Sequence, residues 1–166
     1  MSTEADEGLE IKRRAMAGEG PRTERTEKIE VRRLIPATPA EVFEAWRDPR
    51  IMQQWYFPGA GWSSHMVHDF EPGGLYNLEM KAPNGEIHMH SGEYREITPV
   101  ERLSFTWNTP FVQNTLVTVH LRPAGNDTDL LIVHEFPAGV GVDVPGLHGQ
   151  GWTGTLDHMQ AVFRAD

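Results

Sequence analysis

The side chains best suited to acid–base chemistry or to polar ligand contacts lie on segments with strand-like patterns. They are His88, His90, His134, Tyr76, Tyr94 and Glu96. His88 and His90 are two residues apart, so they share one face of a strand, from which they could bind a ligand, move a proton or coordinate a metal ion. Zinc needs three or four ligands in a fixed geometry, and no motif spacing supplies the others. We therefore predict no metal site, and an exposed or packed strand face remains the alternative for this pair.

His134 and Glu96 are the two candidate catalytic residues. His134 alternates with the apolar residues Leu130, Ile132 and Phe136, which places it on an inward face. A buried histidine needs a hydrogen-bond partner, so His134 is either a satisfied core residue or a proton donor or acceptor at a cavity. A buried Glu96 would have a raised pKa suited to acid–base work. Whether the chain is an enzyme stays open.

The strands that carry these side chains must pack against another element, and the sequence offers the long C-terminal helix predicted for residues 144–164. Trp152, Leu156, Met159 and Phe163 recur at the spacing of one helical stripe, and His148 lies one turn before Trp152 on that stripe. The opposite side is polar. The helix therefore presents a large apolar face that another element must cover.

Nearly everything between the N-terminal segment and that helix is predicted to be strand. The strands are expected at 29–35, 66–70, 75–80, 86–97, 102–107, 115–121 and 129–136. Two short helices follow the first strand, the first with Thr38 as N-cap and Glu41 as its capping-box partner. Gly92 inside a strand indicates a bulge or a close approach. Successive strands with short turns predict an antiparallel sheet, and its gap with the helix is a natural cavity.

The fold class is therefore α+β, with a curved antiparallel sheet of about six to seven strands wrapped around the C-terminal helix. Residues 1–28 mix charges of both signs and predict a flexible tail, whereas residues 29–166 form the domain. The 166 residues contain no cysteine and carry a net charge of -9, which argues against nucleic acid or an anionic membrane as partner. No signal peptide or membrane-spanning run is visible, so we expect a soluble, cytoplasmic protein.

Between about Ile29 and Phe163 the chain resembles the START-like, helix-grip (SRPBCC) superfamily, and within it the group named after the activator of the heat-shock chaperone ATPase. The resemblance rests on the segments 39–46, 48–49 and 54–55, 70–74, 92–97 with 99 and 102–103, and 148–152 with Leu156, Met159 and Phe163. It implies a helix-grip domain with an internal pocket for an apolar or aromatic molecule. Members include ligand carriers, polyketide cyclases, chaperone activators and antibiotic self-resistance proteins.

We therefore predict a domain that binds a hydrophobic, aromatic, polyketide-like or lipid-like molecule between sheet and helix, without metal or cofactor. The predicted ligand-binding residues are Tyr76, Met80, His90, Trp107, His134, Phe136, Trp152 and Met159. Three alternatives remain: a cyclase, dehydratase or hydrolase in the same pocket, a self-resistance protein against a reactive natural product, and a chaperone-interaction module. The last would contact its protein partner through the N-terminal tail or through Trp62, which lies in a loop rich in glycine and serine.

Overall fold

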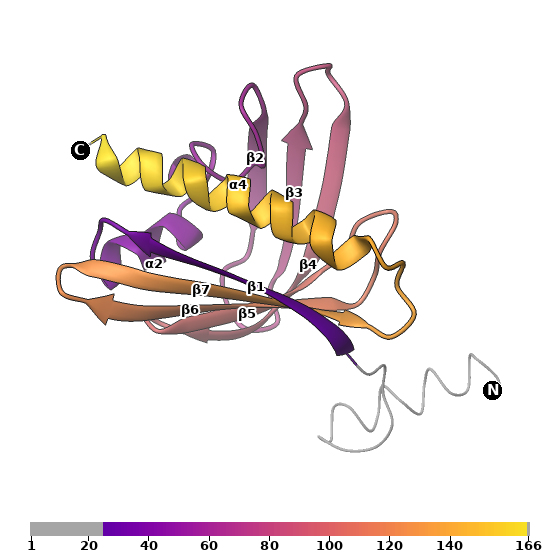
Figure 1. Ribbon diagram of the computed structural model, residues 1–166. Coiled ribbons are helices and arrows are strands. Elements are labelled where there is room, and N and C mark those ends of the chain that lie inside the picture. Colours follow the sequence, from indigo (N-terminus) through magenta and orange to yellow (C-terminus); the bar gives the residue numbers. More distant parts are fainter. Residues whose placement is uncertain (1–24, 166) are drawn as a thin grey trace.

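The computed structural model describes residues 25–165, which form one curved antiparallel sheet with a long helix across it (Figure 1). The strands are β1 (Arg25–Ile35), β2 (Ser63–His68), β3 (Leu75–Lys81), β4 (Ile87–Thr98), β5 (Arg102–Trp107), β6 (Thr115–Ala124) and β7 (Asp127–Pro137). The helices are α2 (Pro39–Arg47), α3 (Pro49–Met52) and α4 (Val144–Arg164). The predicted α+β class and order of elements are confirmed. No helix within residues 25–165 is long and apolar enough to span a membrane.

The strands pair in the order β1-β7-β6-β5-β4-β3-β2, so the first strand forms one edge of the sheet and pairs with the last strand. β1 begins at Arg25 and pairs with β7 from Arg25↔Pro137 to Ile35↔Thr128. The sequence predicted this strand only from Ile29, because residues 27 and 28 are charged and lack the apolar pattern of a strand. Pairing with β7 stabilises this part of β1 instead. Residues 25–28 of the predicted tail thus belong to β1, and residues 1–24 lie outside the described residues.

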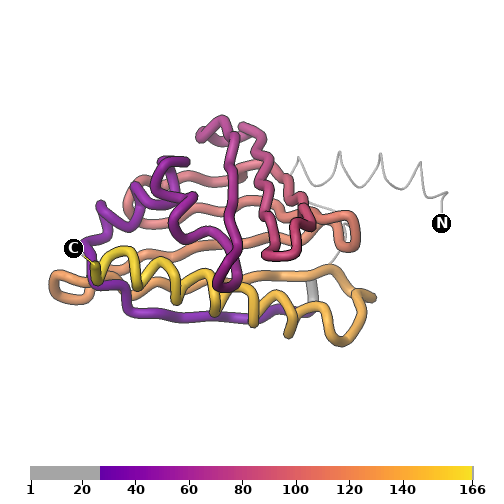
Figure 2. The backbone as a smooth tube through the Cα atoms, turned by 90° about the horizontal axis from the view of Figure 1, so that it is seen from above, coloured from indigo at the N-terminus to yellow at the C-terminus, as the bar shows by residue number. Residues whose placement is uncertain are grey.

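Helix α4 lies along β1 on the concave side of the sheet, as the two perpendicular views show (Figures 1 and 2). The Gln160 side chain donates to the backbone carbonyl of Leu34 (2.8 Å), and Arg33 forms an ion pair with Asp157. These contacts fix the C-terminal half of α4 against the edge strand. The helix therefore has a defined register over the sheet.

The two short helices fill one end of the space between the sheet and α4. The predicted capping box is present: the Thr38 N–H donates to the Glu41 carboxylate (2.9 Å), and the Glu41 N–H donates to the Thr38 hydroxyl (3.3 Å). Trp46 on α2 is buried, and its ring lies 4.7 Å from Trp55, 5.5 Å from Tyr56 and 6.2 Å from Trp152 between centroids. This aromatic cluster makes the end of the domain near α2 a solid core.

Gly92 allows β4 to pass close to β5, as its place inside a strand indicated. A Cβ atom at this position would lie 1.9 Å from the backbone oxygen of Thr106. A register shift follows between Tyr94 and Glu96, so Tyr94 faces Phe105 while Glu96 pairs with Ser104. This bulge puts Tyr94 and Glu96 on opposite faces of the sheet, although residues two apart normally share a face.

Candidate functional site

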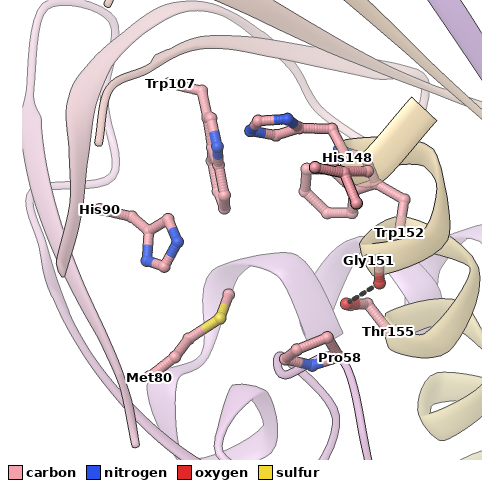
Figure 3. Close-up of a pocket in the computed structure, with 9 residues that line it drawn as sticks. Pro58, Met80, His90, Trp107, His148, Gly151, Trp152 and Thr155 are labelled. Atoms are coloured by element: carbon pink, nitrogen blue, oxygen red, sulfur yellow. Dashed lines mark hydrogen bonds between the residues drawn. The ribbon is translucent and has the colours of Figure 1, made fainter. Parts of the chain in front are cut away.

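A cavity of about 170 Å³ lies between the concave face of the sheet and the N-terminal half of α4 (Figure 3). We call it the inner cavity. Its wall is mainly apolar and comes from strands β3, β4 and β5, from helix α4 and from the loop after α3. The lining residues are Pro58, Met80, His90, Trp107, Leu147, His148, Gly151, Trp152 and Thr155. A cavity of about 150 Å³ holds one benzene ring, so this one suits a single aromatic ring.

Strand alternation and helix periodicity bring these residues together. Tyr76, Leu78 and Met80 form the buried face of β3, of which Met80 is the member that lines the inner cavity. On α4 the cavity wall follows the helical spacing 147, 148, 151, 152 and 155. The Thr155 hydroxyl donates to the Gly151 carbonyl (2.8 Å, dashed in Figure 3), so its polar atom is satisfied within the helix.

His90 is the polar group that the sheet contributes to the cavity. Its Nδ1 lies 3.4 Å from the Leu78 carbonyl oxygen, which can only accept, so we assign the proton to Nδ1 and the acceptor role to Nε2. The ring packs on Trp107 with centroids 4.7 Å apart. Burial lowers the pKa of His90 to about 4. The side chain is therefore a neutral hydrogen-bond acceptor at neutral pH.

His148 is the corresponding polar group on the helix. Its Nδ1 lies 2.9 Å from the Val144 carbonyl oxygen, so by the same argument Nδ1 donates and Nε2 accepts. Burial lowers the pKa of His148 below its ordinary value as well. Both imidazoles line the inner cavity, and Figure 3 shows the ring of Trp107 between them.

Trp107 closes the cavity from β5, and only 5% of it is exposed. Its indole Nε1 is buried and has no hydrogen-bond partner among the residues that the structure describes. A buried donor without an acceptor destabilises a protein by roughly 1–3 kcal/mol. Trp107 is thus both an apolar wall and an unsatisfied donor.

His134 is enclosed in a chain of hydrogen bonds behind this wall. The indole N–H of Trp152 donates to Nδ1 (3.0 Å), so the proton of the neutral ring resides on Nε2, which donates to the Thr115 hydroxyl (2.9 Å). That hydroxyl donates in turn to the Trp107 carbonyl (2.6 Å). Both ring nitrogens are occupied and the ring is fully buried, so of its two interpretations the geometry favours the satisfied core histidine.

Three other predicted ligand-binding residues also lie outside the cavity lining. The Tyr76 hydroxyl donates to the Thr106 carbonyl (2.6 Å), Phe136 stacks on His134 with centroids 4.2 Å apart, and Met159 is fully buried in the solid core. Met80, His90, Trp107 and Trp152 do line it. The sequence analysis placed His148 on the helical stripe but did not identify it as a site residue, and it also missed Pro58, Leu147, Gly151 and Thr155. Extending the stripe through His148 and Trp152 by helical spacing would have found the last three.

Glu96 lies on the outer face of the sheet, away from the cavity, because of the bulge in β4. It accepts hydrogen bonds from Arg102 (2.8 Å) and from the Thr98 hydroxyl (2.9 Å). These bonds hold the pKa of Glu96 below its ordinary value. The expectation of a buried glutamate with a raised pKa is therefore corrected, because the bulge turns Glu96 outward, where Arg102 and Thr98 stabilise its charged form.

His88 does not join His90 at the inner cavity. Its Nε2 lies 3.3 Å from a carboxylate oxygen of Glu86, and its ring is 5.3 Å from the half-buried ring of Trp62. Within the described part of the chain, no three histidine or acidic side chains are placed to hold a metal ion. The contact with His88 gives Trp62 a packing role, and its role as a partner contact stays a prediction.

A larger groove of about 670 Å³ opens beside the inner cavity and shares His90, Leu147 and His148 with it. We call it the outer groove. It runs between β4, the loop before β6 and the first turn of α4. Its walls include the exposed apolar residues Ile87, Met89, Phe111 and Leu147, of which Phe111 is 94% exposed. The outer groove therefore continues the inner cavity to the surface.

Comparison with known proteins identifies a family and solved structures that share this architecture. Residues 36–164 match the model of the family described as activator of Hsp90 ATPase homolog 1-like protein. A crystal structure of a protein from Chromobacterium violaceum is similar at 28% identity and a TM-score of 0.74, over 84% of this chain and 98% of that chain. A solution structure of an AHSA1-like protein from Aeromonas hydrophila is 22% identical with a TM-score of 0.71, over 84% and 93% of the two chains. No curated protein matches in sequence.

Proposed function

Because this chain belongs to the family of activator of Hsp90 ATPase homolog 1-like proteins, we propose that it is a small-molecule binding domain for an aromatic, hydrophobic ligand. The helix-grip fold commonly binds hydrophobic ligands between sheet and helix. The observation that carries the proposal is the inner cavity, an apolar space of about 170 Å³ bordered by Trp107, Trp152 and Met80. Concave, mainly apolar sites with few polar groups are typical of ligand pockets.

The size of the two spaces sets the shape of the ligand. The inner cavity accommodates one ring, whereas the outer groove accommodates an extension of that ring toward the surface. Ile87, Met89 and Leu147 would cover an apolar extension, such as the remainder of a polyketide-like or lipid-like molecule. The ligand thus has a rigid aromatic head and an apolar body.

Catalysis is the weaker alternative for this pocket. His134 has both ring nitrogens in internal hydrogen bonds, and Glu96 lies on the other face of the sheet. The imidazoles that do border the cavity have lowered pKa values, and for His90 the value is about 4, which makes it a weak base at neutral pH. Binding without turnover requires none of these groups to exchange a proton.

The test is a thermal-shift screen against aromatic, polyketide, sterol and fatty-acid compounds, with two matched glycine variants. A ligand that binds only the folded state raises the melting temperature by mass action. Gly151 lines the inner cavity and Gly146 lies on the exposed side of the same helix, and a Cβ atom at either position meets nothing within 4 Å. Gly151→Leu fills the cavity and should abolish the shift, whereas Gly146→Leu should retain it.

Two results would contradict the proposal. The first is that no aromatic compound raises the melting temperature of the wild-type protein. The second is that a compound raises it equally in the Gly151→Leu and Gly146→Leu variants, since binding would then occur elsewhere than the inner cavity.

A further inference from the structure

The polar side chains that line the inner cavity include two imidazole rings, those of His90 and His148. The wall presents two imidazole nitrogens with free lone pairs, Nε2 of His90 and Nε2 of His148, because each ring donates through Nδ1 to a backbone carbonyl. The indole Nε1 of Trp107, which neighbouring atoms cover, has no acceptor within residues 25–165. Within residues 25–165 the lining therefore offers two acceptors next to a covered donor, and it includes no Asp, Glu, Lys or Arg side chain.

This set complements one chemical group better than others. A hydroxyl donates one hydrogen bond and accepts others, so it can donate to an imidazole nitrogen while it accepts from an indole N–H. We propose that the ligand's aromatic head carries a neutral hydroxyl group, as in a phenol, which donates to His90 or His148 and accepts from Trp107. This inference rests on the proposed function, because it concerns the ligand of the same cavity.

The acceptor on His90 lies close to the covered donor on Trp107. The ring of His90 packs on Trp107 at 4.7 Å between centroids, so the acceptor and the unsatisfied donor belong to adjacent rings. Neighbouring atoms cover the Trp107 N–H, so the proposal requires the indole ring to turn on binding and bring this donor to the ligand oxygen. Ligand binding would then satisfy a donor that the protein leaves without an acceptor.

The same set disfavours carboxylates. A carboxylate only accepts hydrogen bonds, so it would face two lone pairs and find one donor. Protonating either imidazole would provide a counter-charge, but burial opposes the charged form of both rings. Aromatic acids and fatty acids should therefore bind more weakly than phenols of similar size at neutral pH.

Three single-ring compounds separate these possibilities by calorimetry at pH 7: 4-methylphenol, para-xylene and benzoate. Para-xylene replaces the hydroxyl by a methyl group of nearly equal size and measures the apolar contribution alone. Two hydrogen bonds of ordinary net strength should make 4-methylphenol bind about tenfold more tightly than para-xylene. Benzoate should bind at least about tenfold more weakly than 4-methylphenol, because its charge stays without a counter-charge.

Variants assign the preference to residues. His90→Phe and His148→Phe keep an aromatic ring but remove an acceptor, and Trp107→Phe removes the donor. The preference for 4-methylphenol over para-xylene should fall in Trp107→Phe and in at least one histidine variant, whereas His65→Phe on the exposed surface of β2 should leave it unchanged. In wild-type protein, the indole N–H proton resonance that is missing from the spectrum of Trp107→Phe should shift downfield with 4-methylphenol and not with para-xylene.

The outcomes distinguish this inference from the proposed function. Equal affinity for 4-methylphenol and para-xylene, or tightest binding of benzoate, overturns the hydroxyl recognition and leaves the hydrophobic binding domain in place. A preference that survives in all three variants also overturns it. Failure of all three compounds to bind overturns the proposed function and this inference together.

Discussion

The two halves of helix α4 face the same sheet, yet one half is packed solid and the other borders a cavity. The C-terminal half inserts Leu156 and Met159, both fully buried, into the aromatic cluster around Trp46. The N-terminal half presents Gly151 and the half-buried His148 to the inner cavity. The difference shows that one helix can complete a solid core at one end and border a cavity at the other, because Leu156 and Met159 fill the first end whereas Gly151 leaves space at the second.

A matched pair of leucine truncations should expose this difference most strongly. Leu156 is fully buried, so Leu156→Ala should destabilise the protein by about 2–5 kcal/mol through lost burial and a new cavity. Leu147 is 60% exposed, so Leu147→Ala should change stability by less than about 0.5 kcal/mol. Urea unfolding measures both. Similar losses in the two variants would show that the helix is packed uniformly.

Two glycines three residues apart on α4 should respond with opposite signs. A Cβ atom on Gly154 would lie 1.9 Å from the Pro58 carbonyl oxygen, so Gly154→Ala must displace the helix or the loop and should destabilise by about 1–3 kcal/mol. A Cβ atom on Gly151 meets nothing within 4 Å, so Gly151→Ala should stabilise the helix by about 0.5–1 kcal/mol.

The stabilised Gly151→Ala variant also tests the link between stability and binding. The added methyl group occupies part of the inner cavity, so affinity for a ring-sized ligand should fall while the melting temperature rises. Thermal unfolding and calorimetry on the same preparations measure both quantities. A variant that gained stability with unchanged affinity would show that the ligand does not use the space beside Gly151.

Acidification should destabilise the protein through its buried histidines. Burial lowers the pKa values of His90, His134 and His148 below the ordinary value of 6.5, so the unfolded chain binds more protons than the folded one as the pH falls below 6.5. These rings therefore leave the free energy of unfolding unchanged above pH 6.5. They lower it as the pH falls from 6.5 toward about 4, the pKa of His90. The lowered pKa of the Glu96 carboxyl affects the free energy of unfolding only at still lower pH, below its ordinary value of 4.5.

Unfolding free energies at pH 7, 6 and 5 measure this effect, and His90→Phe should make the fall shallower. His65→Phe is the control, because that side chain is exposed on β2. A free energy of unfolding that stays constant from pH 7 to pH 5 would mean that these imidazoles take up protons in the folded protein, and so are not neutral acceptors.

The smallest effect is expected on the outer face of the sheet. Glu96→Gln removes the negative charge from the ion pair with Arg102, whose atoms lie 2.8 Å apart and are solvent-exposed. Exposed ion pairs contribute little, so the melting temperature should change slightly and more at low salt than at high salt. Ligand affinity should not change. A clear loss of affinity would show that this face communicates with the inner cavity.

The fold was largely predictable because its signals are local and periodic. The stripe through Trp152 and Leu156 predicted α4, and Thr38 with Glu41 predicted the start of α2, since helix periodicity and capping depend on residues close in sequence. Resemblance to a family then predicted the helix-grip arrangement. The family match over residues 36–164 confirms the family, and the seven-stranded sheet with α4 across it confirms the arrangement. The beginning of β1 escaped prediction because charged residues there are held by pairing with a strand about a hundred residues away.

The sequence by itself determined the inward faces of β3, β7 and α4, and only the tertiary structure decided what each inward residue does. Alternation marked Met80, His134 and Phe136 alike, but the fold leaves space beside Met80 and closes it around His134 with bonds to Trp152 and Thr115. A bulge in β4, which the spacing did not place, puts Glu96 on the outer face of the sheet. The physical reason is that a cavity is what remains after side-chain volumes from distant segments are packed together, and no spacing within one segment records that remainder.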